Sequence, residues 1–271
     1  LSRSQTRSTA SAEGAGGTAC GHAAGQVFGT DIDPESVSAA RFVLLLAFIE
    51  EYRLSGRGPV SPEILREAAC SLSRSVRCGN ALIAPDYFTG KPVFPFNAEE
   101  RRRVNPFDWQ EAFPDIAAAG GFDTVIGAPP PYRPFAVQAR EEYFQTHYGA
   151  YAPSAGLYGY FIERGISLLR PGGNLGVLVP GTFLRSQHAR PLRRLILTRR
   201  IVAISSTGRT RGLSKSDVPE YFLQLRNEPP SGSFVVSTGM SGSGPEPGTA
   251  GVRSFTLSQH ALGDGGWRLE D

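Results

Sequence analysis

The stretch GLYGYFIERGISLLRPGGNLGVLVPGTFLRSQHARPLRRLIL, residues 156–197, decides the fold class of this chain. Its first part has the apolar spacing of a helix, with one face formed by Leu157, Phe161, Ile166 and Leu169. Pro171-Gly172-Gly173 predicts the end of that helix. The following NLGVLVP is a continuous apolar run, typical of a central parallel strand that is buried on both faces. A basic helix is expected next, so the stretch predicts a helix–strand–helix unit.

Strands and helices alternate on both sides of this unit. Residues 26–54 indicate a short strand, a turn and a helix that Asp33 caps and Pro34 begins. Ser61 and Pro62 repeat the device for a second helix. Further strands are expected in SVRC, FDTVIG, IVAISST and EYFLQLRN. This alternation predicts an α/β fold with a doubly wound, mainly parallel sheet. The proline-rich residues 84–119 are expected to be loops.

The cysteine content and the apolar runs of the chain indicate its cellular compartment. The chain has 271 residues and three cysteines, Cys20, Cys70 and Cys78, without a CxxC spacing. This pattern favours a reducing compartment and predicts neither disulfides nor a metal site. The longest apolar run, 42–49, is far too short to span a membrane, and residues 1–17 lack the hydrophobic core of a secretory signal. We therefore expect a cytoplasmic protein with no membrane partner.

Positive charge is concentrated in one segment. Residues 185–226 contain ten Arg or Lys and two acidic residues, whereas the net charge of the whole chain is +3. A basic region on an otherwise slightly acidic chain is typical of a nucleic-acid face. A solvated basic helix is the alternative explanation for the same charges.

Polar or rigid residues follow three of the predicted strands. In such sheets ligands bind beyond the carboxyl ends of the strands. Asp31 is placed to bind the hydroxyls of a ribose, or else it assists the helix cap. Asn80 either forms a hydrogen bond with a purine edge or is a turn residue. After FDTVIG, prolines 129–131 fix a backbone that accepts hydrogen bonds but donates none, or simply form a rigid turn.

Taken together, these motifs resemble one family. VFGTDIDPESVSAARF, VRCGNALI, FDTVIGAPPPYRPF, the stretch 156–197 and EYFLQLRN occur in the order found in gamma-group adenine-specific DNA methyltransferases of the TaqI-like and type IIG restriction-modification kind. The resemblance covers roughly residues 17–271 and implies a Rossmann-like methyltransferase fold, here a catalytic-domain fragment with an incomplete first βαβ unit. It also implies methyl transfer from S-adenosyl-L-methionine to the exocyclic amine of adenine in DNA.

The resemblance assigns roles to particular residues. The family's Asn-Pro-Pro-Tyr motif, on which a flipped adenine stacks and forms hydrogen bonds, falls on Ala128, Pro129, Pro130 and Pro131, with Tyr132 one place late. The cofactor would contact Ala19, Cys20, Gly21, Asp31, Ile32, Asn80 and Ala81. The DNA partner, a duplex with a flipped adenine, would contact Arg133, Arg185, Arg193, Arg194 and Arg211. The family's chemistry needs no metal.

The motifs depart from the family pattern at both ends of the expected site. Ala128 lacks the side-chain oxygen that the family's asparagine supplies, and Pro131 lacks an aromatic face. Near Cys20 the glycine-rich cofactor motif is incomplete, and the chain to Val27 is too short for a crossover helix. We therefore expect impaired transfer, and expect Ala128 at the end of a central strand.

The expected organisation has three parts. Residues 1–17 are a disordered segment, 18–227 the degenerate catalytic domain, and 228–271 a flexible connector leading to an absent target-recognition domain or nuclease module. The alternative function is a non-catalytic DNA-binding or partner-binding remnant. A nicotinamide-dependent oxidoreductase has little support, because no GxGxxG follows a strand.

Overall fold

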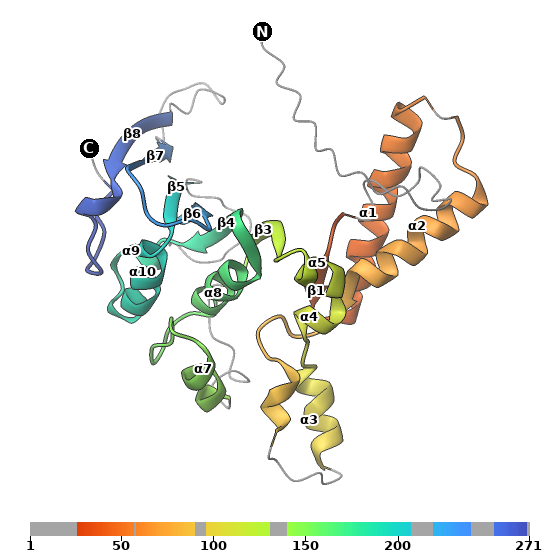
Figure 1. The fold of residues 1–271 in the computed structure, drawn as a ribbon, viewed down its shortest axis with the longest axis horizontal. Helices are drawn as coiled ribbons and strands as arrows, with labels where there is room; N and C mark the ends of the chain where they lie inside the picture. Colours follow the sequence, from red (N-terminus) through yellow and green to blue (C-terminus); the bar gives the residue numbers. More distant parts are fainter. Residues whose placement is uncertain are drawn as a thin grey trace, which may run out of the picture. The chain divides into compact units, whose positions relative to one another are not determined.

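The computed structural model describes residues 26–56, 58–89, 96–130, 140–206, 219–239 and 252–269. Its chain divides into two compact units, Leu1–Asn80 and Ala81–Asp271. Each unit has its own sheet, and the elements are labelled in Figure 1. None of the helices in these ranges is long and apolar enough to cross a membrane.

The first unit is a strand–helix–helix–strand arrangement. Its elements are β1 (Gly29–Asp31), α1 (Pro34–Leu54), α2 (Pro62–Ser75) and β2 (Val76–Cys78). The two strands pair in parallel, with Asp31 opposite Cys78. Both expected caps are confirmed, because the Asp33 carboxylate accepts from the backbone N–H groups of Glu35 and Ser36, and Ser61 accepts from that of Ile64.

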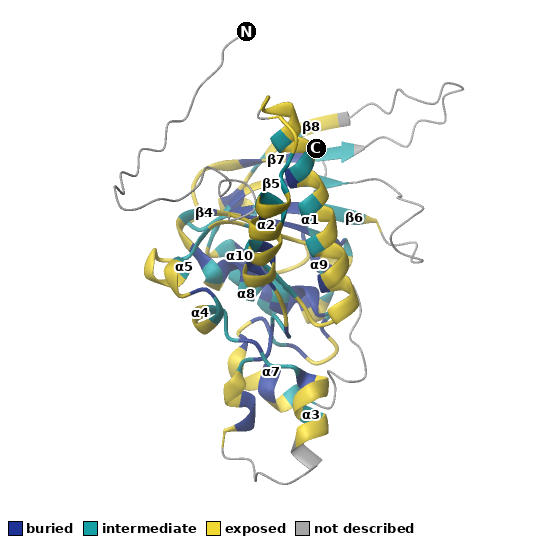
Figure 2. Ribbon diagram, turned by 90° about the vertical axis from the view of Figure 1, so that its right-hand side faces the viewer, coloured by how far each residue is buried: buried dark blue, intermediate teal, exposed yellow. Residues whose placement is uncertain are grey.

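Helices α1 and α2 are tied together by one arginine and one apolar cluster. The Arg41 guanidinium donates to the carbonyl oxygens of Ser73 and Val76 at the end of α2, the shortest contact being 2.6 Å. Phe48 packs against Leu72. Much of α1 is exposed, as the yellow parts of the helix in Figure 2 show, and its exposed residues include Phe42 at 62% and Leu54 at 81%.

The second unit carries a six-stranded sheet. Its helical elements before the second strand are η1 (Pro85–Phe88), α3 (Phe96–Val104), α4 (Trp109–Ala112), α5 (Pro114–Ala118), α7 (Glu141–His147) and α8 (Tyr158–Leu168). The later helical elements are α9 (Thr182–Arg185), η2 (Gln187–Ala189), α10 (Arg190–Leu197) and η3 (Gln259–Ala261). The strands are β3 (Phe122–Gly127), β4 (Leu169–Pro180), β5 (Arg200–Ser206), β6 (Glu220–Arg226), β7 (Ser233–Gly239) and β8 (Val252–Ser258).

The strand order is β3-β4-β6-β5-β7-β8. The pairs β3–β4 and β5–β7 are parallel, whereas β6 runs antiparallel to both of its neighbours and β8 runs antiparallel to β7. The predicted α/β class is confirmed, and the sheet of this unit is mixed. Strands β7 and β8 bring residues 233–239 and 252–258, expected in a connector, into the sheet.

The core of the second unit lies between this sheet and helices α8 and α10. Val177 and Val179 of β4 are 2% and 1% exposed, as a buried strand requires. They face Ile162 of α8 and Ile196 of α10 within one apolar cluster. Trp267 belongs to the same cluster, so the residues after β8 also close the core.

A second, aromatic cluster lies on the other side of α8. Its members are Leu82, Ile83, Tyr87, Phe88, Val104, Tyr143, Phe144, Tyr148, Leu157 and Tyr160. Helix α8 therefore serves two cores, with Ile162 in the sheet core and Tyr160 in the aromatic one. The expectation of loops over 84–119 was wrong, because η1, α3, α4 and α5 form there against the aromatic residues.

Two helix boundaries also differ from the sequence prediction. Helix α8 ends at Leu168, and Pro171-Gly172-Gly173 lies within β4, where the pairing with β3 shifts between Phe122 and Thr124. Gly172 has a φ of 76° there, which a side-chain-bearing residue rarely adopts. The basic helix is broken at Ser186 into α9 and α10, since Ser186 is extended and Pro191 begins a new helical turn.

Candidate functional site

The carboxyl ends of β1 and β2 meet in the first unit. The backbone N–H of Gly79 donates to the carbonyl oxygen of Asp31 over 2.8 Å, and the Thr30 hydroxyl donates to the carbonyl of Gly79 over 2.9 Å. The strands are parallel, so the residues that follow each of them emerge at one edge. Asp31, Ile32 and Asn80, three of the expected cofactor residues, are thus brought together.

The side chains at this edge suit an adenosine group. The Asp31 carboxylate is exposed, and its Oδ1 accepts one hydrogen bond, of 2.9 Å, from the backbone N–H of Asp33. Ile32 is 49% exposed, and Asn80 is half-buried. A carboxylate for two hydroxyls, an apolar surface and an amide are groups that bind a ribose and a purine.

Of the remaining expected cofactor residues, the structure describes only Ala81. Ala81 belongs to the second unit, where its carbonyl oxygen accepts from the indole N–H of Trp109 over 3.1 Å. That carbonyl therefore helps to fix the Trp109 cluster. Ala19, Cys20 and Gly21 lie outside the described residues.

The proline motif follows β3 in the second unit. Ala128 is exposed directly after Gly127, and Pro129 and Pro130 are half-buried. Pro131, Tyr132 and Arg133 lie outside the described residues. The expectation of a central strand was wrong for the sheet of this unit, because within the described ranges β3 pairs with β4 alone and forms the edge of the sheet. Ile126 of this strand is 78% exposed although the FDTVIG run is apolar.

The expected DNA-contacting arginines are in four different situations. Arg185 is exposed at the end of α9, and Arg211 lies outside the described residues. Arg194 is exposed on α10, and its guanidinium is paired with Asp264. Arg193, however, is 2% exposed.

The burial of Arg193 rules out the phosphate contact expected of it. Its guanidinium donates to the carbonyl oxygens of Phe183 and Ser186, both over 2.8 Å, and to that of Asp264 over 3.1 Å. Burial lowers the pKa of this guanidinium, and the nearby Asp264 carboxylate opposes that shift. Arg193 thus satisfies carbonyl groups at the break between α9 and α10.

A cluster that no sequence motif predicted joins η1 to α7. The His147 Nε2 lies 3.1 Å from an Asp86 carboxylate oxygen, and the Tyr143 hydroxyl donates to the other oxygen over 2.9 Å. The Tyr143 and His147 rings stack with centroids 3.9 Å apart. Tyr143 and His147 have helical i,i+4 spacing, but nothing in the sequence pairs them with Asp86. Among the described residues, no three His, Cys, Asp or Glu side chains gather as a metal site would require.

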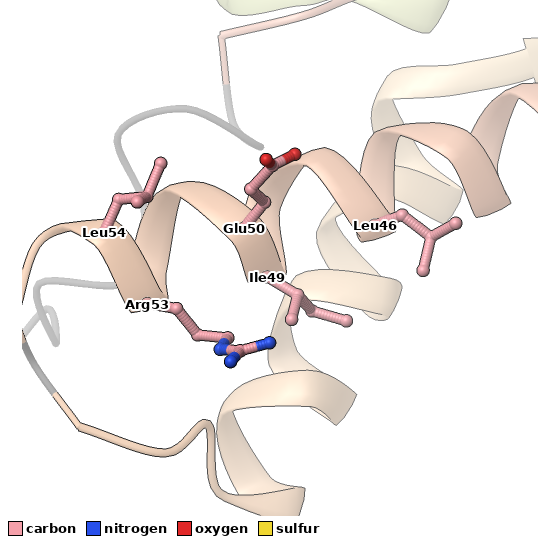
Figure 3. A pocket seen from close by; sticks show the side chains of 5 residues that line it. All are labelled: Leu46, Ile49, Glu50, Arg53 and Leu54. Carbon is pink, nitrogen blue, oxygen red and sulfur yellow. The ribbon is translucent and has the colours of Figure 1, made fainter.

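A hollow on α1 offers no comparable set of groups. Figure 3 shows its lining side chains, all from this one helix, with Ile49 and Arg53 on one side and Glu50 on the other. Leu46 and Leu54 complete the lining. The mostly aliphatic lining, with one acid and one base that point apart, does not form a polar binding constellation.

The alternating strands and helices, with parallel pairs in both sheets, define a Rossmann-like α/β protein. The chain belongs to the Eco57I restriction-modification methylase family, whose sequence model matches residues 25–209. It is 37% identical over 82 residues to the Type II methyltransferase M.PaeR7I of Pseudomonas aeruginosa. That match covers 30% of this chain and 14% of the relative, so the chain spans a small part of the length of this relative.

Solved structures give weaker likenesses. The EcoKI M protein of a Type I restriction enzyme has a TM-score of 0.40 and 15% identity, over 78% of this chain and 35% of that one. A Listeria monocytogenes protein described as a class I S-adenosylmethionine-dependent methyltransferase has a TM-score of 0.42 and 18% identity, over 78% and 58%. The DNA-bound ATP-dependent Type ISP enzyme LlaBIII has a TM-score of 0.46 and 10% identity, over 78% and 15%.

Proposed function

We propose that this chain carries part of an S-adenosyl-L-methionine-dependent DNA methyltransferase of the adenine-specific, gamma-group kind, with an impaired transfer step. The observation that carries the proposal is the meeting of Asp31, Ile32 and Asn80 at one edge of the first unit, in a member of the restriction-modification methylase family. The sheet edge provides the binding groups, and membership of the family indicates which ligand they would bind.

The cofactor would be held by that edge. The Asp31 carboxylate would accept hydrogen bonds from the two ribose hydroxyls, while Ile32 and Asn80 would contact the adenine ring. When bound, the cofactor supplies an activated methyl group. The role of the protein is to hold the adenosine end in place, with the exposed Asp31 carboxylate available to the ribose hydroxyls.

The target adenine would be received by the backbone after β3. Prolines at 129 and 130 give carbonyl acceptors on a stiff chain, and such acceptors orient an exocyclic amine for attack. A flipped base would stack on an aromatic side chain, a role for which Tyr132 is the nearest residue in the sequence. The DNA partner would be a duplex, with sequence recognition by a further domain.

The impairment follows from Ala128. An asparagine at this position would add a side-chain oxygen next to the backbone carbonyl, and the alanine methyl group accepts nothing. Loss of one preorganised polar contact to a reacting group costs about 100-fold to 1,000-fold in rate. The incomplete glycine motif near Cys20 adds to this loss on the cofactor side.

The alternative is a remnant that binds DNA or a protein partner without catalysis. It is favoured by Ala128, whereas the intact Asp31 edge favours retained cofactor binding. Calorimetry with S-adenosyl-L-methionine separates these two readings, because the remnant needs no cofactor. Exposed positive charge on α9 and α10 is compatible with both the methyltransferase and the non-catalytic remnant.

A tritiated-methyl transfer assay on adenine-containing duplex DNA tests the proposal together with that calorimetry. We expect cofactor binding but undetectable or very slow labelling, and labelling that stays low in the Ala128→Asn, Pro131→Tyr double variant because the glycine motif remains incomplete. Robust labelling by the unaltered chain would show that our view of Ala128 is wrong. Absence of both cofactor binding and DNA binding would overturn the methyltransferase assignment.

A further inference from the structure

Two exposed arginines of α10 converge on a single carboxylate oxygen. The Nε atoms of Arg190 and Arg194 lie 3.0 Å and 2.5 Å from Oδ2 of Asp264. The two arginine side chains are 57% and 62% exposed, and the aspartate side chain is 26% exposed. This arrangement presents two guanidinium groups, one helical turn apart, to one anionic oxygen at the surface.

The position of Asp264 is fixed by the fold around it. Its backbone carbonyl accepts from the buried Arg193, and the backbone N–H of Trp267 donates to the carbonyl of Leu184 over 2.7 Å. The Trp267 indole is 2% exposed and donates to the carbonyl of Gly263 over 2.6 Å. Residues 263–267, the Asp264 strap, are therefore held on α9 and α10 by buried contacts that do not involve the Asp264 carboxylate.

The carboxylate is charged where it lies. Hydrogen bonds from Arg190, and then from Arg194, hold the pKa of Asp264 below its ordinary value. An ionised carboxylate on a fixed strap offers the same kind of oxygen that a phosphodiester offers to a pair of arginines. It also reduces the local charge of the arginine pair from +2 to +1.

We propose that Arg190 and Arg194 are contacts for a DNA phosphate, and that Asp264 occupies them in the free protein as an internal competitor that lowers DNA affinity. This inference rests on the proposed function, because DNA is the ligand. A phosphate oxygen replaces the carboxylate oxygen between the two guanidinium groups, while the buried strap contacts of Arg193 and Trp267 stay in place. The aspartate thereby keeps nonspecific binding weak.

The variant Asp264→Asn tests this directly. Fluorescence anisotropy with a labelled duplex, titrated at several salt concentrations, should show tighter binding by on the order of tenfold at low salt. The plot of log K against log salt should become steeper by about 0.9, the change expected when the local charge of the arginine pair rises by one. The melting temperature reports separately whether the strap remains folded.

A matched control is Asp123→Asn. Asp123 also pairs with a surface arginine, since its carboxylate lies 2.5 Å from the Nε of Arg170. This variant changes the net charge of the chain equally but leaves α10 untouched, so its affinity and salt slope should stay near those of the unaltered protein. An equal gain in both variants would overturn the inference in favour of a general charge effect.

A second variant keeps the inference falsifiable if Asp264→Asn disturbs folding. The double change Arg190→Gln, Arg194→Gln should weaken DNA binding and flatten the salt slope, and it should abolish the gain produced by Asp264→Asn. Unchanged DNA affinity in this double variant would contradict the proposal. If the unaltered chain and Asp264→Asn both fail to bind duplex at low salt, the proposed DNA-binding function is wrong. If the unaltered chain binds and Asp264→Asn binds no more tightly, only the inference about Asp264 is wrong.

Discussion

Gly79 donates its backbone N–H to the carbonyl oxygen of Asp31, 2.8 Å away, and so joins two residues 48 positions apart in the chain. The bond continues the β1–β2 pairing by one residue beyond Cys78. It leaves the Asp31 carboxylate pointing clear of the pairing, at an exposed position. The backbone is thereby fixed while the side chain stays available to a ligand.

Replacing Asp31 should weaken cofactor binding without unfolding the protein. Hydrogen bonds to charged groups contribute about 1.5–3 kcal/mol, so Asp31→Ala should raise the dissociation constant of S-adenosyl-L-methionine by about 10-fold to 100-fold. Titration calorimetry measures this, and Asp115→Asn, an exposed change on α5, serves as the control. Equal affinity in Asp31→Ala and the unaltered protein would place the cofactor elsewhere.

Two neighbouring glycines before β3 should differ sharply in their tolerance of alanine. A Cβ on Gly121 would lie 2.5 Å from the carbonyl oxygen of Leu168 and 2.7 Å from the N of Arg170, whereas a Cβ on Gly120 meets nothing within 4 Å. Both glycines have positive φ, so Gly120→Ala should cost only the backbone strain, about 1–2 kcal/mol. Gly121→Ala should cost clearly more in the free energy of unfolding, measured in urea, and comparable losses would refute the steric explanation.

The Arg193→Met variant should be strongly destabilised. The change removes the guanidinium that donates to three carbonyl oxygens, the buried bond to Phe183 and the partly buried bonds to Ser186 and Asp264. A buried acceptor left without its donor costs about 1–3 kcal/mol, so losing a donor shared by three carbonyls should lower the melting temperature by several degrees or more. The exposed Arg102→Met on α3 is the control and should melt like the unaltered protein. A small effect at position 193 would mean that the break between α9 and α10 does not depend on this side chain.

Tyr148 should make stability fall at high pH. Burial raises its pKa to about 12, and its hydroxyl donates to the carbonyl of Leu82 while it accepts from Arg164. The unfolded tyrosine ionises near 10, so the stabilisation is complete below pH 10 and is lost as pH rises toward 12. Tyr148→Phe should lose about 1–2 kcal/mol at neutral pH.

The same variant should also show a smaller loss of stability between pH 10 and 12. Urea unfolding at several pH values measures both effects on one set of samples. Parallel pH profiles for Tyr148→Phe and the unaltered protein would contradict the assignment to Tyr148. The pKa values of Tyr143 and Tyr158 are also raised by burial, so some loss remains in the variant.

Local signals predicted the elements that local interactions stabilise. The caps at Asp33 and Ser61 and the buried strand at Val177 need only their near neighbours or a simple apolar pattern. The elements between Pro85 and Ala118 could not be predicted in this way. They are short helical segments, and the contacts that hold them come from aromatic residues such as Tyr143, far along the chain.

The residues of the candidate site also differ in how far the sequence could predict them. Asp31 and Asn80 could be chosen as candidates because one ends a strand and the other lies just beyond a strand, and the parallel pairing of those strands brings them together. The burial of Arg193 and the pairing of Asp264 with α10 could not be predicted, since both depend on how residues 263–267 fold back on α9 and α10. Charge along a sequence shows where arginines are, and only packing shows which of them face solvent.

Helix α8 packs on two cores at once, and this limits how freely its sequence can vary. Across Tyr158–Leu168, Ser167 is the one exposed position. A Cβ added to Gly165 would lie 2.7 Å from the Cδ1 of Leu175, so a larger residue there would have to displace that side chain. A saturation library over this helix should therefore return mostly unaltered residues, with free variation at Ser167, and its tolerance map should look like that of a wholly interior helix.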